Sequence, residues 1–347
     1  MPSIREVARS AGVSIATVSR VMNGADTVTP DLRRKVMQAV ERCDYSPKVG
    51  RRSLDAIAVI YVGPFTVGSP YDSACLDGMV EAMRESEFDL MIVDLARDRS
   101  PDETLRQFFA RKGIRGAILR STVAERRITL EFAEEELPLV VLGDHFECDK
   151  LSFAFAESYE ASRDAVEHLV SLGHTRIAFA ACERDDGDHL DRLLAYREVV
   201  QRHNLLDESL VCRVPAERLD GAQLLRNLLG MPGRPTALFI ADPLVAVGAV
   251  NEAHRMGVRI PEDLSIVGFD DSDTRNTVFP HMSAVCQDAK LVGRTAWELV
   301  VERCLSGPRS AVPSATPQQA WLEICNTSGP APSNPDRVLP TGARLPS

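Results

Sequence analysis

The chain has 347 residues, with 40 Lys and Arg against 50 Asp and Glu, so its formal net charge at neutral pH is −10. Its hydrophobic content of 44% can fill more than one core, and two or three domains are expected at this length. No apolar run approaches the roughly 20 residues of a membrane-spanning helix, and the first residues lack a signal-peptide pattern. The eight cysteines are scattered without a C-x-x-C pair. These features argue against membrane, secreted, disulfide-rich and metal-binding classes, and we expect a cytoplasmic protein that holds no cofactor.

Residues 4–23 predict two short helices joined by a turn. Ser3 and Glu6 are spaced as a capping box, which starts the first helix, and an apolar face at helical spacing follows. Gly12 ends that helix, and Ser14 caps the next one. The second helix buries its valines and exposes its other side, which is how a helix meets the DNA major groove. The exposed side chains are Ile15, Ala16, Thr17, Ser19 and Arg20.

A third helix is expected after Thr29 and Pro30, with an apolar stripe that ends at Cys43. Alone, this pattern also fits a three-helix bundle without any partner. Charge favours the DNA-binding interpretation. Residues 1–54 carry ten basic and five acidic groups, a net charge of +5, and the remainder carries 30 basic and 45 acidic groups, a net charge of −15. A basic head on an acidic body indicates that the head alone binds nucleic acid.

Beyond residue 55, apolar strand-like runs alternate with amphipathic helical stretches. The strands are expected at 57–62, 90–95, 116–119, 139–142, 177–181, 237–240 and 264–269. The helices are expected near 73–86, 101–112, 158–172, 189–203, 219–229, 243–256 and 288–305. This alternation predicts parallel sheets with helices on both faces. There are enough strands for two similar halves, and a ligand is expected in the cleft beyond the carboxyl ends of the strands.

The domain boundaries follow from the same patterns. We expect a helix-turn-helix head at 1–46, a hinge at 47–55, and a body at 56–328. The first half of the body takes in about 56–153 plus 281–312, and the second half about 154–280 plus 313–328. The stretch at 329–347 is rich in Pro, Gly and Ser, and it is expected to be a disordered tail.

Short stretches in the head and the body point together to one family. The matching stretches of the head are 7–23, 45–47 and 52–54, and those of the body are 168–169, 172–174, 176–179, 246–249 and the long run Pro-Glu-Asp-Leu-Ser-Ile-Val-Gly-Phe-Asp-Asp at 261–271. With them, the chain resembles the lactose-repressor (LacI/GalR) family of bacterial transcriptional regulators from Ile4 to about Gly329. The resemblance implies a homodimer whose heads read the half-sites of a double-stranded DNA operator. It also implies an α/β body like a periplasmic sugar-binding protein, with two parallel-sheet subdomains that close on a small effector.

The resemblance assigns DNA contacts to the head. The expected contacts are Ser14, Ile15, Ala16, Thr17, Ser19, Arg20, Asn23 and Leu54. Arg20 is the candidate for a bidentate guanine contact, the hydroxyl and amide side chains are expected to bind phosphates, and Leu54 is expected to enter the minor groove at the operator centre. Ser14 alone could be no more than a helix cap, and Leu54 could be the first core residue of the body.

The resemblance also assigns an effector site to the body. The expected ligand contacts are Tyr71, Ser73, Asp144, Arg192, Asp242 and Asp270. Asp242 replaces the asparagine usual in the family, and an ionised carboxylate can only accept hydrogen bonds. His145 and Cys325 stand where the family commonly has arginine. The site is therefore expected to be more acidic than is usual, which favours a polyhydroxylated or cationic effector, such as a sugar or nucleoside, over a phosphorylated or carboxylated one.

The function predicted from these features is a sequence-specific DNA-binding repressor controlled by a sugar-like effector. One alternative is a regulator whose body has lost sugar binding and responds to another small molecule or to a partner protein. A solute receptor without DNA binding is disfavoured by the basic head. An enzyme is disfavoured because the sequence has no nucleophile elbow, phosphate loop or metal-ligand spacing.

Overall fold

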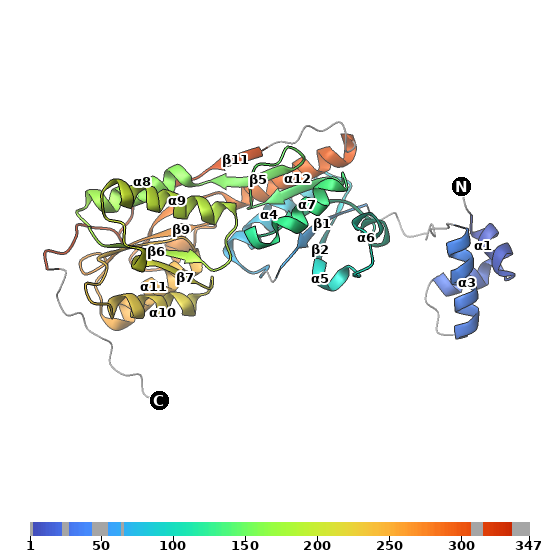
Figure 1. Ribbon diagram of the computed structural model, residues 1–347, viewed down its shortest axis with the longest axis horizontal. Helices are drawn as coiled ribbons and strands as arrows, with labels where there is room; N and C mark the ends of the chain where they lie inside the picture. Colours follow the sequence, from blue (N-terminus) through green and yellow to red (C-terminus); the bar gives the residue numbers. More distant parts are fainter. Residues whose placement is uncertain (1–2, 23–27, 44–54, 64–65, 307–314, 335–347) are drawn as a thin grey trace, which may run out of the picture. The chain divides into compact units, whose positions relative to one another are not determined.

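The computed structural model describes residues 3–22, 28–43, 55–63, 66–306 and 315–334 (Figure 1). The chain divides into two compact units, Met1–Leu54 and Asp55–Ser347. Within the described residues, no helix combines the length and the apolar character needed to cross a membrane.

The first unit is a three-helix bundle made of α1 (Ile4–Ala11), α2 (Ile15–Met22) and α3 (Pro30–Arg42). The backbone N–H of Ser3 donates to Glu6 Oε2 at 2.8 Å, as in the predicted capping box. Gly12 ends α1 with a φ of 61°, a left-handed conformation that costs glycine little. A small core lies between the helices and consists of Val7, Ala8, Ala11, Val18, Val21, Val36 and Ala39. The predicted helix-turn-helix is therefore confirmed.

The first half of the second unit is built on a parallel sheet. In chain order its strands are β1 (Ala56–Tyr61), β2 (Asp89–Asp94), β3 (Ile114–Arg120), β4 (Leu139–Leu142), β5 (Ser152–Glu157) and β11 (Ala315–Gln319). They lie side by side in the order β11-β5-β4-β3-β1-β2. One face packs on α4 (Pro70–Met83) and α12 (Ala289–Ser306), and the other face packs on α6 (Leu105–Lys112) and α7 (Arg126–Glu134). Short turns α5 (Leu95–Asp98) and η1 (Val123–Glu125) complete this half.

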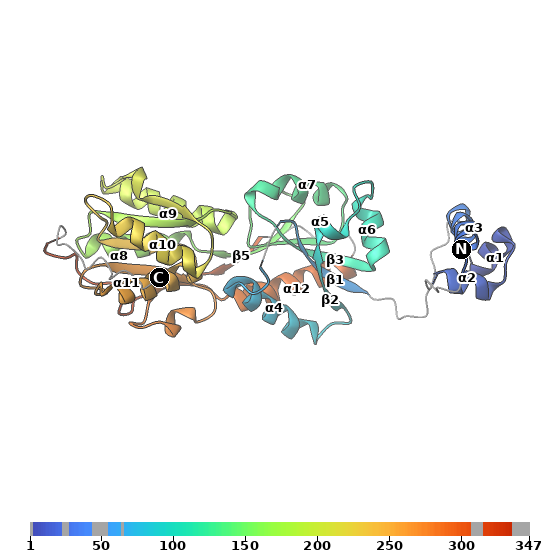
Figure 2. The ribbon, with the colours of Figure 1, turned by 90° about the horizontal axis from the view of Figure 1, so that it is seen from below.

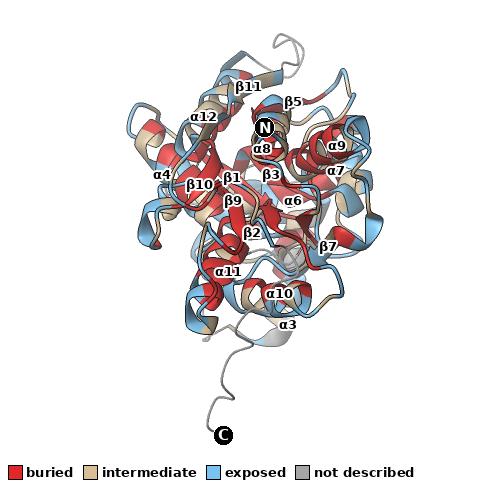
Figure 3. Cartoon of the chain, turned by 90° about the vertical axis from the view of Figure 1, so that its left-hand side faces the viewer, coloured by how far each residue is buried: buried red, intermediate tan, exposed pale blue. Residues whose placement is uncertain are grey.

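The second half repeats the same plan. Its strands are β6 (Ile177–Cys182), β7 (Val211–Val214), β8 (Ala237–Ile240), β9 (Ser265–Asp270), β10 (Ser283–Cys286) and β12 (Trp321–Glu323). Their order is β12-β10-β9-β8-β6-β7, and only β12 runs antiparallel to its neighbour. One face is covered by α8 (Tyr159–Ser171) and α9 (Gly187–Arg202), and the other by α10 (Arg218–Leu229) and α11 (Pro243–Met256). Two further turns are η2 (Glu208–Leu210) and η3 (Thr274–Thr277). The two halves are seen from below in Figure 2, and Figure 3 shows buried residues on central strands such as β1, β3, β9 and β10.

The chain passes between the halves three times: after β5, after β10 and after β11. Each crossing lies several residues after the expected boundary at 153, 280 or 312, because β5, β10 and β11 are strands that the sequence patterns did not predict. The short apolar runs of β5 and β10 do not distinguish strand from helix, and β11, with the sequence Ala-Thr-Pro-Gln-Gln, has no apolar alternation. The predicted hinge at 47–55 lies outside the described residues, apart from Asp55.

The expected disordered tail is corrected for residues 329–334. The N–H of Gly329 donates to Ser265 Oγ at 3.0 Å, and its carbonyl oxygen lies 3.0 Å from His174 Nε2. The N–H of Ala331 donates to the carbonyl of Leu172 at 2.9 Å. Composition predicted disorder here, but hydrogen bonds to the second half hold these residues. The stretch at 335–347 lies outside the described residues.

Candidate functional site

The exposed side of α2 carries the predicted DNA contacts. Val18 and Val21 are buried in the bundle, whereas Ile15 is 45% exposed and Ala16 and Arg20 are exposed beside it. Ser14 is also exposed, and Thr17 and Ser19 are half-buried. A hydrogen bond from Thr17 N to Ser14 Oγ, at 3.1 Å, caps the helix. Asn23 and Leu54 lie outside the described residues.

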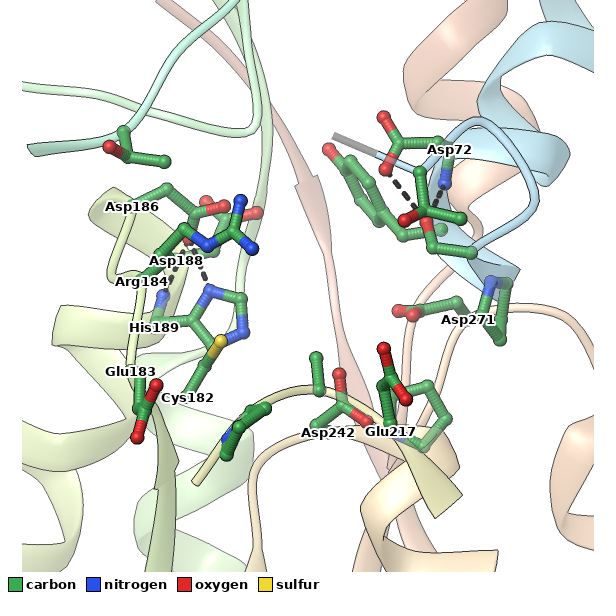
Figure 4. Close-up of a pocket in the computed structure, with 18 of the residues that line it drawn as sticks. Asp72, Cys182, Glu183, Arg184, Asp186, Asp188, His189, Glu217, Asp242 and Asp271 are labelled. Atoms are coloured by element: carbon green, nitrogen blue, oxygen red, sulfur yellow. Dashed lines mark hydrogen bonds and ion pairs between the residues drawn. The ribbon is translucent and has the colours of Figure 1, made fainter. Parts of the chain in front are cut away.

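A cavity of about 190 Å³ lies between the two halves of the second unit. Residues at or just beyond the carboxyl ends of the strands line it, among them Arg120 at the end of β3, Cys182 at the end of β6 and Gln287 just after β10. This is the position expected for a ligand in parallel sheets. The walls carry seven acids and three arginines, namely Asp72, Glu183, Asp186, Asp188, Glu217, Asp242 and Asp271, with Arg120, Arg184 and Arg192. Figure 4 shows Asp186 and Asp188 facing Asp72 and Asp271 across the cavity.

Arg120 links the two halves at one wall of the cavity. Its guanidinium is buried, and it donates to Asp72 Oδ1 at 3.3 Å and to Asp186 Oδ2 at 2.9 Å. Asp186 belongs to the second half and caps α9 by accepting from the N–H of His189 at 3.0 Å. Burial alone would raise the pKa of Asp186, but the neighbouring His189 and Arg120 hold this pKa below its usual value. The guanidinium of Arg120 also lies 4.9 Å from the ring centre of Tyr71.

Asp144 forms a second link between the halves. It is completely buried and accepts two hydrogen bonds from Arg126, at 2.6 and 3.0 Å, within the first half. The N–H of Gly187, at the start of α9 in the second half, donates to the same carboxylate at 2.8 Å. Asp144 therefore contacts protein groups from both halves and does not line the cavity.

His145 forms a third link. Its Nδ1 lies 3.4 Å from Asp188 Oδ1, and its Nε2 lies 3.1 Å from Asp191 Oδ2. Burial lowers the pKa of this imidazole, but the two carboxylates outweigh burial and raise the pKa to about 10. His145 is thus a cation at neutral pH, and it bridges the first half to α9 of the second.

Three of the predicted ligand contacts line the cavity: Tyr71, Arg192 and Asp242. Arg192 is buried, donates to the carbonyl of Ala241 at 2.8 Å and lies 3.5 Å from the ring centre of Phe269. Its Nε and the hydroxyl of Tyr71 are buried, and neither has a hydrogen-bond partner among the described residues. Such groups are costly unless a ligand or water satisfies them.

Asp242 and Asp271 contribute carboxylates to the same cavity. Asp242 Oδ1 caps α11 by accepting from the N–H of Val245 at 2.9 Å. Asp271 accepts from the side-chain amide of Gln287. Burial raises the pKa of both carboxyls, and that of Asp271 reaches about 7. The donors that form hydrogen bonds with these two carboxyls, a backbone N–H and a side-chain amide, are both neutral.

Besides Asp144, two predicted contacts, Asp270 and Ser73, do not line this cavity. Asp270 Oδ2 forms an ion pair with Arg275 at 2.6 Å, and its Oδ1 accepts from the N–H of Thr274 at 2.7 Å. It lies behind the cavity, whereas the next residue, Asp271, lines it. Ser73 is exposed and donates back to the carbonyl of Ser69 at 2.7 Å.

Sequence reasoning missed several lining residues. Asp271 is the second acid of the Gly-Phe-Asp-Asp run, and only the first was considered. Arg120 is a charged residue at the end of an apolar strand, a pattern that could have marked it. Asp72, Asp186 and Asp188 lie in helix first turns or caps, where acids are common for local reasons, so no sequence signal separated them from capping residues.

The head and the body together define a class of protein: a helix-turn-helix DNA-binding head joined to an α/β body with a ligand-sized cavity between two halves. Residues 3–48 match the model of the bacterial regulatory proteins of the lacI family, and residues 166–321 match the periplasmic binding protein-like domain. The chain is therefore similar to the lacI family of bacterial regulatory proteins in its head and to periplasmic binding protein-like domains in its body.

Full-length relatives agree with this assignment. The transcriptional regulator CelR of Thermobifida fusca is 29% identical over 312 residues, which cover 87% of this chain and 92% of CelR. The transcriptional repressor PurR of Haemophilus influenzae strain PittEE is 26% identical over 309 residues, which cover 87% of this chain and 91% of PurR. A solved structure of a CelR–cellobiose complex superimposes with a TM-score of 0.67 at 27% identity and covers 94% of this chain and all of that one.

Proposed function

We propose that this protein is a transcriptional repressor whose dimeric heads bind an operator, and whose body controls that binding through a small polyhydroxylated effector. The observation that carries the proposal is the cavity lined by both halves of the body, on a chain whose head exposes one face of α2. CelR, at 27% identity, was solved with cellobiose, which supports a sugar-like effector for this cavity.

The geometry suggests how an effector acts. A ligand can shift a conformational equilibrium only if it binds one state more tightly than another. A ligand that contacts both walls of the cavity meets this condition, because its contacts depend on how the halves are oriented. In a dimer that reads two half-sites, a change in the body then alters operator affinity, since both heads must be placed together.

Regulation without catalysis is the function that these residues favour. Cys182 lines the cavity, but burial raises the pKa of its thiol, so at neutral pH it is not the thiolate that nucleophilic catalysis requires. The acids of the cavity act as hydrogen-bond acceptors and ion-pair partners. Operator binding places the protein in the cytoplasm, where bacterial chromosomal DNA lies.

Footprinting on genomic DNA fragments captured by the full chain tests the proposal. We expect two protected half-sites related by two-fold symmetry, with an affinity that falls steeply as salt rises because phosphate contacts release counterions. A protected region without symmetry, or an affinity that ignores salt, would contradict operator binding by paired heads.

A further inference from the structure

The buried charges of the cavity do not balance. Four fully buried acids line it (Asp72, Asp186, Asp188 and Asp271), and the partly buried Asp242 adds a fifth. Two buried arginines, Arg120 and Arg192, face them from the same lining, together with the half-buried His189 and the exposed Arg184. Pro64 and Phe65 lie next to the lining residue Thr66 and outside the described residues. Neither side chain is charged, so they do not change this count.

Most of the available cations already hold carboxylates. Arg120 pairs with Asp72 and Asp186, and His145, from outside the lining, pairs with Asp188 at 3.4 Å. Ion pairs thus reach three of the five acids, although Asp188 Oδ1 has no hydrogen-bond partner among the described residues and burial raises the pKa of Asp188 to about 6. They also engage the guanidinium of Arg120, which is therefore not available to an anionic ligand.

Asp271 and Asp242 are the two acids that remain. Among the described residues, Asp271 accepts from the neutral amide of Gln287, and Asp242 accepts from the N–H of Val245. Arg192 lies close enough to influence both electrostatically, but its guanidinium donates to the carbonyl of Ala241. Arg192 influences both carboxylates and the lining His189 also influences Asp242, but among the described residues neither carboxylate forms an ion pair with these cations.

Unpartnered polar atoms in the same cavity point to a ligand. The Nε of Arg192, the Oε1 of Gln287 and the hydroxyl of Tyr71 are buried without a hydrogen-bond partner among the described residues. The three residues are at least nine-tenths buried and line the cavity. They offer a donor, an acceptor and a hydroxyl, which suits a ligand with several hydroxyl groups.

We infer that the effector carries a protonated amine, which Asp271 and Asp242 bind, in addition to hydroxyl groups that contact Arg192, Gln287 and Tyr71. The ligand class is a polyhydroxylated amine of the amino-sugar type. This inference rests on the proposed function, because it specifies the effector of that same cavity. A cation supplies the charge that the two acids lack, and a charge-assisted hydrogen bond is stronger than a neutral one.

Calorimetry with matched ligand pairs tests the inference on the full-length protein. The pairs are D-glucosamine with D-glucose, the β-1,4-linked glucosamine disaccharide with cellobiose, and putrescine with 1,4-butanediol. In each pair that binds, we expect the amine to have a dissociation constant lower by about tenfold or more. A neutral member that binds as tightly as its amine, or no detectable binding by any amine at millimolar concentration, would overturn the inference.

Two variants show whether the preference comes from these acids. Asp271→Asn keeps the acceptor for Gln287, and Asp242→Asn keeps the helix cap, because asparagine caps as well as aspartate. In either variant the ratio between the dissociation constants of the neutral ligand and the amine should fall. In the double variant the two dissociation constants should become nearly equal. Asp149→Asn removes an exposed acid away from the cavity and should keep the full preference. If the double variant still binds the amine more tightly than the neutral ligand by the same factor, these acids do not bind the amine.

Operator binding measured on the same preparation separates the two proposals. If the protein binds DNA and a neutral sugar releases it while amines do not, the proposed function stands and the amine inference fails. If the protein does not bind DNA at all, the proposed function fails, and the wild-type ligand pairs still decide whether the cavity prefers amines.

Discussion

Asp270 and Asp271 are neighbours in the chain, yet their surroundings give them opposite roles. Asp270 is buried against Arg275 and the N–H of Thr274, so its charge is compensated within the protein. Asp271 is just as buried, but its hydrogen-bond partner is the neutral amide of Gln287. Removing an uncompensated buried charge stabilises a fold, whereas removing one partner of a buried pair destabilises it.

We predict that Asp271→Asn raises the melting temperature of the ligand-free protein above pH 7. Burial raises the pKa of Asp271 to about 7, so the folded state holds a proton that the unfolded state loses near pH 4. Stability is therefore lost as the pH rises from about 4 to 7, and the variant avoids this loss. The gain should be a few degrees, which corresponds to about 1 kcal/mol or more in a protein of this size.

Thermal melts at pH 5 and pH 8 check this prediction. The difference between Asp271→Asn and wild type should be larger at pH 8. Asp270→Asn is the matched control, and it should lower the melting temperature because Arg275 loses its closest carboxylate, at 2.6 Å. An Asp271→Asn variant that melts lower than wild type at pH 8 would show that the carboxylate is compensated.

Arg20, which is exposed on α2, is the predicted guanine contact of the head. If it makes a bidentate guanine contact, Arg20→Ala should cost about 1–3 kcal/mol on the preferred operator and relax specificity at one base pair per half-site. Competition binding with single-base operator variants measures both effects. A uniform loss of affinity on all sequences would instead identify Arg20 as a phosphate contact.

At the scale of elements, α4 and α12 pack backbone against backbone on the first sheet. Gly78 of α4 lies against the carbonyl of Lys290, and Gly293 of α12 lies against the carbonyl of Cys75. A side-chain Cβ at either position would clash with backbone atoms that cannot rotate away. The close crossing therefore depends on these two glycines, and through it the sheet keeps one of its covered faces.

Gly78→Ala should destabilise the protein by about 1–3 kcal/mol, the usual range for overpacking a core, although alanine is the better helix former. Chemical denaturation measures the loss. Gly68→Ala provides the comparison, because its nearest neighbour, a flexible side chain, lies 3.9 Å away. Equal stability of the Gly78→Ala variant and wild type would mean that the two helices can separate without cost.

At the scale of the whole body, the first turns of α9 gather the polar links between the halves. Asp186, Gly187 and Asp188 contact Arg120, Asp144 and His145 respectively. All six residues lie beside the cavity or line it, so a ligand that enters meets the same surfaces that hold the halves together. We therefore expect a ligand to change the orientation of the halves.

The link through His145 should depend on pH. Its pKa is raised to about 10, so its stabilising contribution is complete below about pH 6.5 and is lost as the pH rises through 10. His145→Gln should therefore lower the melting temperature most near pH 6 and progressively less toward pH 10. His203→Gln, which removes an exposed pair with Glu167, should have little effect at any pH. A His145→Gln effect that does not change with pH would show that the ion pairs contribute nothing.

The sequence by itself determined the order of the elements and the two-part architecture. The capping box at Ser3, the valines of α2 and the alternation of apolar runs with helical stretches each report local burial, and local burial follows from periodicity. The same signals missed β7, β10, β11 and β12, which are short or partly exposed, and also β5, which is six residues long and mostly buried. The crossings between the halves were therefore expected several residues too early in the chain.

The tertiary structure alone decided which carboxylates compensate one another. Tyr71, Arg192 and Asp242 were predicted from the resemblance, but the pairing of Arg120 with Asp186 joins residues 66 positions apart in different halves. A charged side chain has the same sequence signature whether it caps a helix, forms a buried pair or faces an empty cavity. Its role depends on the partners that folding brings within hydrogen-bond distance, because both the desolvation cost and its compensation arise from that environment.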